Sequence, residues 1–433
     1  MIDEVLKNRI LRLIRAEVVP AVGCTEPVAV ALCVARATEI LKSGPCGELS
    51  HIGCRLSANI IKNAMGVGIP GTGMTGLPIA VALGALTGRS ELGLEVLCDV
   101  TPEDVENGKK IIDSGIIDID LATEADDVLY IAVTVTDDAG NSARAVISGG
   151  HTTFVLEERN GQVIMEAGKG KDGGCDDHSV PELNLHMVWE FATTVPVEEL
   201  EFILETRRLN KLAAERALMA EYGHRVGRTL HSERQRRIMG DSIFSRILSY
   251  TAAACDARMG GAPVAVMSNS GSGNQGIAAT MPVAIYAEES YADRERTVRA
   301  LILSHLTSIY IKQSLGRLSA LCGCVVATTG SSAGICYLMG GGYEQVEATV
   351  KNMAANLTGM ICDGAKPSCA LKLTSGVSTA VISAMVAMEG DCVGELEGIV
   401  DRDVDRTVTN LTTIGRDGMT QTDALILKIM TEK

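Results

Sequence analysis

The stretch VLYIAVTVTDDAGNSARAVISGGHTTFVLEERNGQVIMEAG, residues 128–168, alternates apolar and polar side chains over most of its length. Alternation of this kind is typical of strands that bury one face. Two groups of turn-forming residues, DDAGN at 137–141 and RNG at 159–161, divide the stretch. It therefore predicts an antiparallel meander whose strands are joined by short turns.

The flanks of this stretch predict the rest of a small module. GLEVLCDV at 93–100 favours a strand, and TPEDVENGKKIIDSG at 101–115 favours a helix with Thr101 and Glu103 at its start. GKGKDGGCDDHSVPE, at 168–182, has the composition of a polar linker. After Pro181 the pattern is helical almost to the C-terminus.

A chain of 433 residues is longer than one hydrophobic core usually supports. We expect an α+β fold, with a large, mainly helical domain and a smaller α/β module that carries an antiparallel sheet. The predicted divisions are an N-terminal helical segment at 1–88 that packs with the C-terminal domain, the α/β module at 89–180, and the large helical domain at 181–433.

The net charge of −15 argues against nucleic acid and anionic membranes as partners. Three uncharged runs, at 63–88, 259–287 and 318–343, are long enough to span a membrane, but Gly, Ser, Thr, Asn or Pro interrupts each. We expect buried, glycine-rich segments instead. The first 24 residues lack the pattern of a signal peptide, so we expect a cytoplasmic protein that contacts no membrane.

The 13 cysteines are an odd number in a compartment that keeps thiols reduced, so a disulfide framework is not expected. Six lie in apolar or periodic stretches and are predicted to be plain buried side chains: Cys33, Cys54, Cys98, Cys255, Cys336 and Cys392. Two lie in polar loops and are predicted to be exposed: Cys46 and Cys175. Five lie at breaks between apolar elements: Cys24, Cys322, Cys324, Cys362 and Cys369.

Thiolates at helix ends and glycine turns lie near backbone N–H groups, which lower the pKa of the thiol and donate hydrogen bonds to sulfur. Iron–sulfur clusters are bound in such surroundings. The spacing matches neither a ferredoxin run nor a zinc pair of C-x-x-C units. From the residues alone, a cluster, a zinc ion and free buried thiols all remain open.

Other candidates come from isolated polar residues. His151 lies in a glycine turn, whereas His305 is expected to be a core histidine. Lys62, Lys312 and Lys366 stand beside uncharged stretches, where a partly buried lysine can act as a base or bind a carboxylate. The loop SNSGSGNQGI at 268–277 offers N–H groups, hydroxyls and amides for a carboxylate or an amine.

Six motifs occur in one order: GCTEP, SANIIKNAMGVGIPGTG, SGGHT, SGSGNQGI, RLSALCG and ICDGAKPSCALKL. Together they resemble the L-cysteine desulfidase family, which is related through its C-terminal domain to the alpha chain of iron–sulfur L-serine dehydratases. The resemblance covers essentially the whole chain. It implies α,β-elimination of L-cysteine to sulfide, ammonia and pyruvate on a [4Fe–4S] cluster, without pyridoxal phosphate.

The resemblance also implies site residues. Three cysteines would bind the cluster, drawn from Cys322, Cys362, Cys369 and Cys24, with Cys324 as the stand-in for Cys322. The α-proton would be removed by one of four candidate bases: Lys62, His151, Lys366 or Cys24. The substrate carboxylate and amine would contact residues of the 268–277 loop: Ser272, Asn274 and Gln275.

Two alternatives accompany this interpretation. One is an L-serine dehydratase on the same scaffold, and the other is a cytoplasmic cysteine or iron–sulfur sensor that is not an enzyme. The expected partner is a small amino-acid substrate, and a homo-oligomer is possible.

Overall fold

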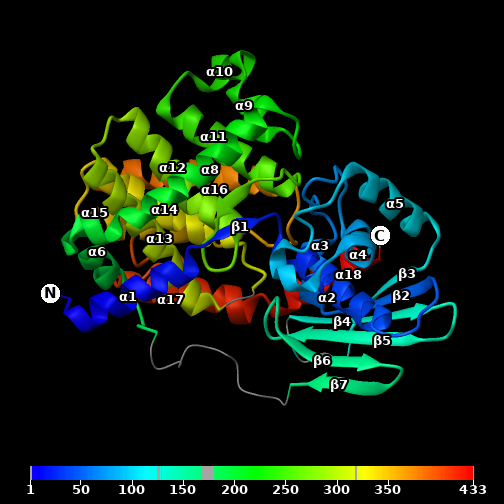
Figure 1. The fold of residues 1–433 in the computed structure, drawn as a ribbon. Coiled ribbons are helices and arrows are strands. Elements are labelled where there is room, and N and C mark those ends of the chain that lie inside the picture. Colours follow the sequence, from blue (N-terminus) through cyan, green and yellow to red (C-terminus); the bar gives the residue numbers. More distant parts are fainter. Residues whose placement is uncertain (1, 124–126, 128, 168–179, 317–318, 433) are drawn as a thin grey trace.

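Two bodies, each with its own hydrophobic core, make up the protein (Figure 1). The computed structural model describes residues 2–123, 127, 129–167, 180–316 and 319–432. The larger body is helical, and the smaller one packs helices on a sheet, so the predicted α+β class is confirmed.

The larger body has a core of small and aliphatic side chains. Its elements are α1 (Glu4–Glu17), β1 (Pro20–Val22), α6 (Leu185–Thr194), α7 (Val197–Leu200), η3 (Glu201–Ile203), α8 (Leu204–Met219), α9 (Val226–His231), α10 (Glu233–Met239), α11 (Ile243–Met259), β8 (Ala265–Met267), α12 (Gly273–Glu289), α13 (Arg294–Leu315), α14 (Gly323–Leu338), α15 (Tyr343–Leu357), α16 (Cys369–Met388), α17 (Val404–Thr413) and η4 (Ile414–Gly418). Glycines let these helices approach closely: a Cβ on Gly330 of α14 would lie 2.3 Å from Ser304 O of α13.

The smaller body is built around the six-stranded sheet. Its elements are α2 (Thr25–Lys42), β2 (Leu49–Leu56), α3 (Ala58–Ala64), α4 (Leu77–Thr87), the 3₁₀ helix η1 (Ser90–Glu95), α5 (Pro102–Asp113), β3 (Ile117–Leu121), β4 (Tyr130–Asp137), β5 (Ser142–Ser148), β6 (Phe154–Arg159) and β7 (Gln162–Glu166). The last helix, α18 (Thr420–Thr431), returns to this body and contacts α3 (Figure 1).

The strands run in the order β3-β2-β4-β5-β6-β7, and only the β2–β3 pair is parallel. The predicted meander forms β4 to β7, with every neighbouring pair antiparallel. Asn160 and Gly161 at the β6–β7 turn both have positive φ, 49° and 74°. This is the conformation that a two-residue Asn-Gly hairpin turn requires.

The predicted division at residue 88 is wrong. Strand β2 lies between β3 and β4, and helices α2 and α4 share the core of the sheet. A central strand needs hydrogen-bonded neighbours on both sides, so most of the segment at 1–88 is part of the smaller body. Helix α1, strand β1, Cys24 and the loop that holds Val67 and Gly68 pack with the larger body, as the prediction had it for the whole segment.

Local predictions in the module had mixed outcomes. The strand expected at 93–100 is wrong, because the 3₁₀ helix covers Ser90–Glu95 and the chain then turns. The helix α5 is confirmed, and Thr101 caps it in a reciprocal pair with Asp104, one residue beyond the expected Glu103. The linker at 168–179 lies outside the described residues.

The three uncharged runs fold into helices too short to span a membrane, α4, α12 and α14, joined by loops. Among the helices of the described residues, α16 alone has the length and mean hydropathy of a candidate span. This helix packs against α11, α14 and α15 within the larger body (Figure 1).

Candidate active site

Two loops that precede helices meet at one short β-bridge. The loop before α14 and the loop before α16 pair antiparallel between Leu321 and Ile361. Cys322 N–H donates to Met360 O at 2.9 Å, and Cys362 N–H donates to Ala320 O at 2.6 Å. The bridge therefore brings two of the predicted cluster ligands, 40 residues apart in sequence, to the same place.

Cys369 completes a group of three thiols. It is the first residue of α16, and its Sγ lies 3.7 Å from Gly364 O. Burial, followed by the neighbouring Cys362, raises the pKa of Cys322 to about 12. Burial is also the main reason that the pKa of Cys369 is raised, with Cys362 adding to it. The bridge and the short turn that leads into α16 thus hold Cys322, Cys362 and Cys369 in one region of the larger body.

Two lysines lie beside these thiols. Lys312, near the end of α13, is half-buried, and desolvation lowers the pKa of its ammonium to about 8, while Cys362 and Cys322 oppose this shift. Lys372 on α16 donates to Ile361 O at 2.9 Å and pairs with Asp363. Positive charge at this position favours thiolates over thiols. Lys372 was not among the predicted residues, although it directly follows the motif SCAL.

The donor set fits an iron–sulfur cluster. Cys322 is the N-cap of α14 and Cys369 opens α16, so both cysteines lie at the positive end of a helix, where backbone N–H groups lack intrahelical partners. Within the described part of the chain, no three His, Cys, Asp or Glu side chains converge on a site for a single ion. A four-iron cluster is larger than a single metal ion, so the thiols that bind it lie farther from one another.

Cys324 packs between two helices. Its buried Sγ donates to Lys372 O at 3.3 Å, and a Cβ on Gly376 would lie 2.9 Å from that sulfur. The thiol therefore occupies the contact between α14 and α16. In position it is less suited than Cys322 to meet Cys362.

Cys24, the remaining candidate ligand, lies apart from the three thiols. It is the N-cap of α2 and is buried where the two bodies meet. Its Sγ donates to Glu26 Oε2 at 2.9 Å and lies 3.8 Å from Asn63 O. Burial and the charge of Glu26 raise its pKa well above the usual range, and Arg258 opposes the shift.

The predicted lysine bases are both engaged. Lys62 is buried on α3, and its Nζ pairs with Asp423 Oδ1 of α18 at 2.6 Å. Lys366 pairs with Asp363 Oδ1 at 2.8 Å and donates to Gly364 O at 3.2 Å. Although burial raises the pKa of Asp363, the two lysines around it lower that pKa to about 2.

The two predicted histidines differ in surroundings. His151 lies in the β5–β6 turn, at the end of the sheet where Tyr130 pairs with Ser148. At the same end, Ser57, the residue before α3, donates its N–H to Tyr130 O. His305 is a core residue, as expected. Its ring nitrogens lie 3.0 Å from Asn269 Nδ2 and from Thr280 Oγ1, and burial lowers its pKa to about 3.

The predicted substrate-binding loop forms the start of α12. Ser272 is the N-cap, and its Oγ accepts from Gln275 N–H at 3.4 Å. Asn274 Oδ1 accepts from Cys255 Sγ at 3.6 Å, and its Nδ2 lies 3.4 Å from Met259 Sδ. The Gln275 side chain lies against Gly323, the residue after Cys322, since a Cβ there would be 2.9 Å from Gln275 Cδ.

Arg258, the last charged residue before the uncharged run at 259–287, was not predicted as a site residue. It lies at the end of α11, is 4% exposed, and its guanidinium covers Gly273 at the start of α12. The signal in the sequence that could have indicated Arg258 is its position as a charged residue at the border of a glycine-rich apolar run.

The other cysteines divide by burial. Cys33, Cys54, Cys255 and Cys336 are buried and Cys46 is exposed, as predicted. The predicted burial of Cys98 and Cys392 is wrong, because both lie in exposed loops at the ends of helices. Cys175 lies outside the described residues.

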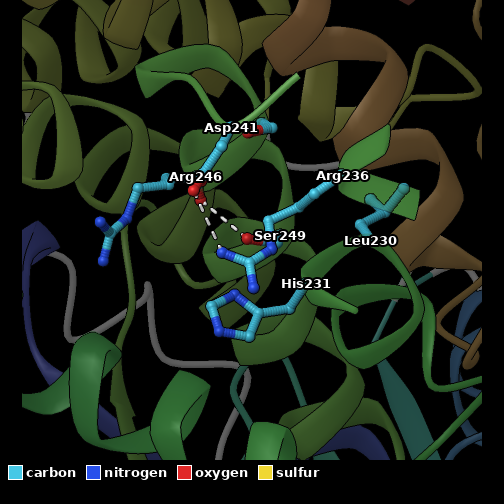
Figure 2. Close-up of a pocket in the computed structure, with 7 residues that line it drawn as sticks. Leu230, His231, Arg236, Asp241, Arg246 and Ser249 are labelled. Atoms are coloured by element: carbon cyan, nitrogen blue, oxygen red, sulfur yellow. Dashed lines mark hydrogen bonds and ion pairs between the residues drawn. The ribbon is translucent and has the colours of Figure 1, made fainter. Parts of the chain in front are cut away.

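A polar hollow of about 110 Å³ lies elsewhere on the larger body (Figure 2). His231, Arg236 and Arg246 line it, together with Leu230, Asp241, Ser245 and Ser249. Arg236 pairs with Asp241, and Arg246 with Glu289. Arg246 precedes Arg258 by twelve residues on α11, about 18 Å along the helix axis. This hollow contains no thiol and is separate from the cysteine site.

Comparison with known proteins agrees with this arrangement. Residues 91–428 match the sequence profile of the serine dehydratase alpha chain. The chain belongs to this family. It is 60% identical over 435 residues to the UPF0597 protein of Phocaeicola vulgatus, covering 100% of this chain and 99% of that one. To the UPF0597 protein of Porphyromonas gingivalis it is 54% identical over 437 residues, covering both chains fully.

Membership places the chain with dehydratase-type lyases, a group associated with iron–sulfur clusters. The expected relation to iron–sulfur serine dehydratases is thereby confirmed. The matched range contains the three clustered thiols, the start of α12 and Arg258, whereas Cys24 and Lys62 precede it.

Proposed function

We propose that the protein eliminates sulfide from L-cysteine, giving ammonia and pyruvate, and that it uses a [4Fe–4S] cluster held by Cys322, Cys362 and Cys369. The observation that carries the proposal is the 321–361 bridge, which brings the backbones of Cys322 and Cys362 together close to the start of α16, where Cys369 lies, with Gln275 of α12 against the adjacent Gly323. A cluster with three protein ligands has one iron free to act as a Lewis acid on the substrate.

We take Cys24 as the base. Its thiol donates to Glu26 Oε2, so that carboxylate is in position to accept the thiol proton as the reaction begins, although burial and the charge of Glu26 raise the pKa of the resting thiol. Lys62 and Lys366 are each held in an ion pair with an aspartate, so both amines are already engaged. His151 remains a predicted alternative on the smaller body.

The elimination needs one proton transfer and one bond cleavage. The Cys24 thiolate takes the α-proton, and the electron pair of the Cα–H bond forms the Cα–Cβ double bond. The Cβ–S bond breaks, and its electron pair leaves with sulfur as HS⁻. The released aminoacrylate tautomerises to an imine, which water hydrolyses to pyruvate and ammonia.

Burial of the site favours these reaction steps. Cys24 and Cys322 are 2% and 8% exposed, so little water reaches the base or the thiols. Exclusion of water strengthens the electrostatic interactions that stabilise the developing charge. The N-terminus of α12 supplies N–H groups for the substrate, with Ser272, Asn274 and Gln275 around them.

The test is a product assay on protein purified and reconstituted without oxygen. We expect sulfide and pyruvate in equal amounts from L-cysteine, and a rate that depends on the iron content of the protein. Cluster-loaded protein that releases neither sulfide nor pyruvate from L-cysteine would contradict the proposal.

The family supports a second candidate substrate, L-serine, because the matched profile is that of a serine dehydratase chain. The same proton transfer would then expel hydroxide. Comparing kcat/KM for L-cysteine and L-serine on one preparation decides between the two. A higher value for L-serine would make the protein a dehydratase.

A further inference from the structure

A buried arginine at the junction of the two bodies has no ion-pair partner among the described residues. Arg258 is 4% exposed, and its Nε makes no hydrogen bond within the described part of the chain. No carboxylate of the described residues lies within ion-pair distance of its guanidinium, unlike Arg36, Arg299 and Arg246. A buried, unpaired cation costs several kcal/mol, so an anion is expected to approach it when the protein works.

The guanidinium lies at the N-terminus of a long helix. A Cβ on Gly273, the first residue of α12, would lie 2.2 Å from Arg258 Nε, so only glycine admits the arginine here. Helix α12 has 17 residues, and Ser272 caps the N–H of Gln275. The N–H groups of the first turn carry the positive end of the helix dipole and add to the charge of Arg258.

A second unpartnered polar group lies at the same helix end. Gln275 is 5% exposed, and its Oε1 makes no hydrogen bond to the described residues. Its side chain lies against Gly323, next to Cys322. An amide with a free carbonyl oxygen is suited to accept a hydrogen bond from an ammonium group. Arg258 and Gln275 together therefore present a cation and an acceptor to one ligand.

Resting on the proposed function, we infer that Arg258 and the N-terminus of α12 bind the α-carboxylate of the amino-acid substrate, while Gln275 accepts a hydrogen bond from its α-ammonium group. The guanidinium matches a carboxylate in a two-bond fork, which a lysine cannot reproduce. The charge of Arg258 reaches Cys24 and opposes the rise in the pKa of its thiol, so a carboxylate held by Arg258 would place Cα on the side of the base. From Cα, the side chain extends past Gln275 toward Cys322.

The experiment measures binding, apart from turnover. L-Alanine carries both charged groups of the substrate but has no group to eliminate, and ethylamine is the same molecule without the carboxylate. Each is titrated by calorimetry into protein purified without oxygen, with its cluster content recorded. The variants are Arg258→Gln and Arg258→Lys, and the control is Arg246→Gln at the other end of α11, whose partner is Glu289.

We expect wild-type protein and Arg246→Gln to bind L-alanine at least tenfold more tightly than ethylamine. Arg258→Gln should weaken L-alanine binding about tenfold to a hundredfold and leave ethylamine unchanged, and Arg258→Lys should recover part of the loss. Wild-type protein that does not distinguish the two ligands would overturn the inference, even if Arg258→Gln failed to fold.

A competing role for Arg258 is to supply a counter-charge to Cys24 alone, and this role predicts a different experimental result. In that case Arg258→Gln would slow alkylation of Cys24 by iodoacetamide but bind L-alanine normally, which overturns the inference. The proposed function fails separately. Protein that binds L-alanine through Arg258 but eliminates nothing would support the carboxylate site and refute the lyase reaction.

Discussion

Cys322 and Cys324 are two residues apart, yet their surroundings differ, and so do the roles that we assign to them. Cys322 caps α14 and faces Cys362 across the bridge, whereas Cys324 fills the contact between α14 and α16. Two residues separate a thiol at the N-cap of α14 from a thiol that packs as a small apolar side chain. Only the first kind is suited to bind a cluster.

Removal of single thiols tests this distinction. We expect Cys322→Ala and Cys362→Ala to lose most of the bound iron, and Cys324→Ala to keep it at a cost of about 1 kcal/mol in packing. Cys336→Ala, another buried thiol of α14, is the matched control. The measurement is iron and acid-labile sulfide per chain in protein purified anaerobically. Full iron in Cys362→Ala would show that the ligand assignment is wrong.

Cys24 tests the base. Loss of a general base typically lowers turnover about a hundredfold or more and leaves substrate affinity nearly unchanged. We therefore expect Cys24→Ala to abolish exchange of the substrate α-hydrogen with deuterated water while the iron content is retained. Cys33→Ala, a buried thiol of the same helix, should exchange normally. Normal exchange in Cys24→Ala would move the search to Lys62, His151 or Lys366.

At the scale of elements, the 359–369 turn is fitted against α3. Gly364 has φ +90°, and a Cβ there would lie 1.9 Å from Lys62 O. The turn therefore needs glycine both for its backbone conformation and for the close approach. The same turn carries Cys362 and leads to Cys369, so its position fixes the spacing of the thiols.

Gly364→Ala should displace this turn. The left-handed conformation costs a side chain about 1–2 kcal/mol, and the clash with a backbone oxygen adds about 1–3 kcal/mol. We expect a lower midpoint of thermal unfolding together with reduced iron content. Gly359→Ala is the control, because the same segment has open space at that position. Equal behaviour of the two variants would mean that the turn adjusts freely.

At the scale of the whole molecule, the site lies where the two bodies meet. Cys24 and α3 approach it from the N-terminal side, and α11, α12, α14 and α16 come from the larger body. Helix α18 then returns across the junction and pairs its Asp423 with the buried Lys62. The C-terminal end of the chain thus fastens the two bodies together (Figure 1).

Asp423→Asn should loosen this junction. It leaves the Lys62 ammonium buried without its partner, at a cost of about 1–3 kcal/mol. We expect faster proteolysis at α18 and a lower unfolding midpoint. Lys428→Met on the same helix, which breaks only an exposed pair with Glu432, should change stability by less than about 1 kcal/mol. Unchanged proteolysis in Asp423→Asn would argue that α18 is held by apolar contacts alone.

Prediction from the sequence succeeded where the signal is local. The alternation and turn residues of 128–168 gave the β4–β7 meander, and Thr101 gave the start of α5. It failed where the outcome depends on a distant partner. Strand β2 joins the sheet through hydrogen bonds to β3 and β4. No residue pattern within 1–88 indicates that these strands are its partners.

The site divides in the same way. By itself, the sequence determined which thiols lie at breaks between helices, because neighbouring glycine, proline and N-cap residues mark the helix ends. Only the tertiary structure decided that Cys322 rather than Cys324 meets Cys362, that Lys62 and Lys366 are paired, and that Arg258 reaches the start of α12. Burial and charge pairing depend on elements that are far apart along the chain, and folding alone brings them together.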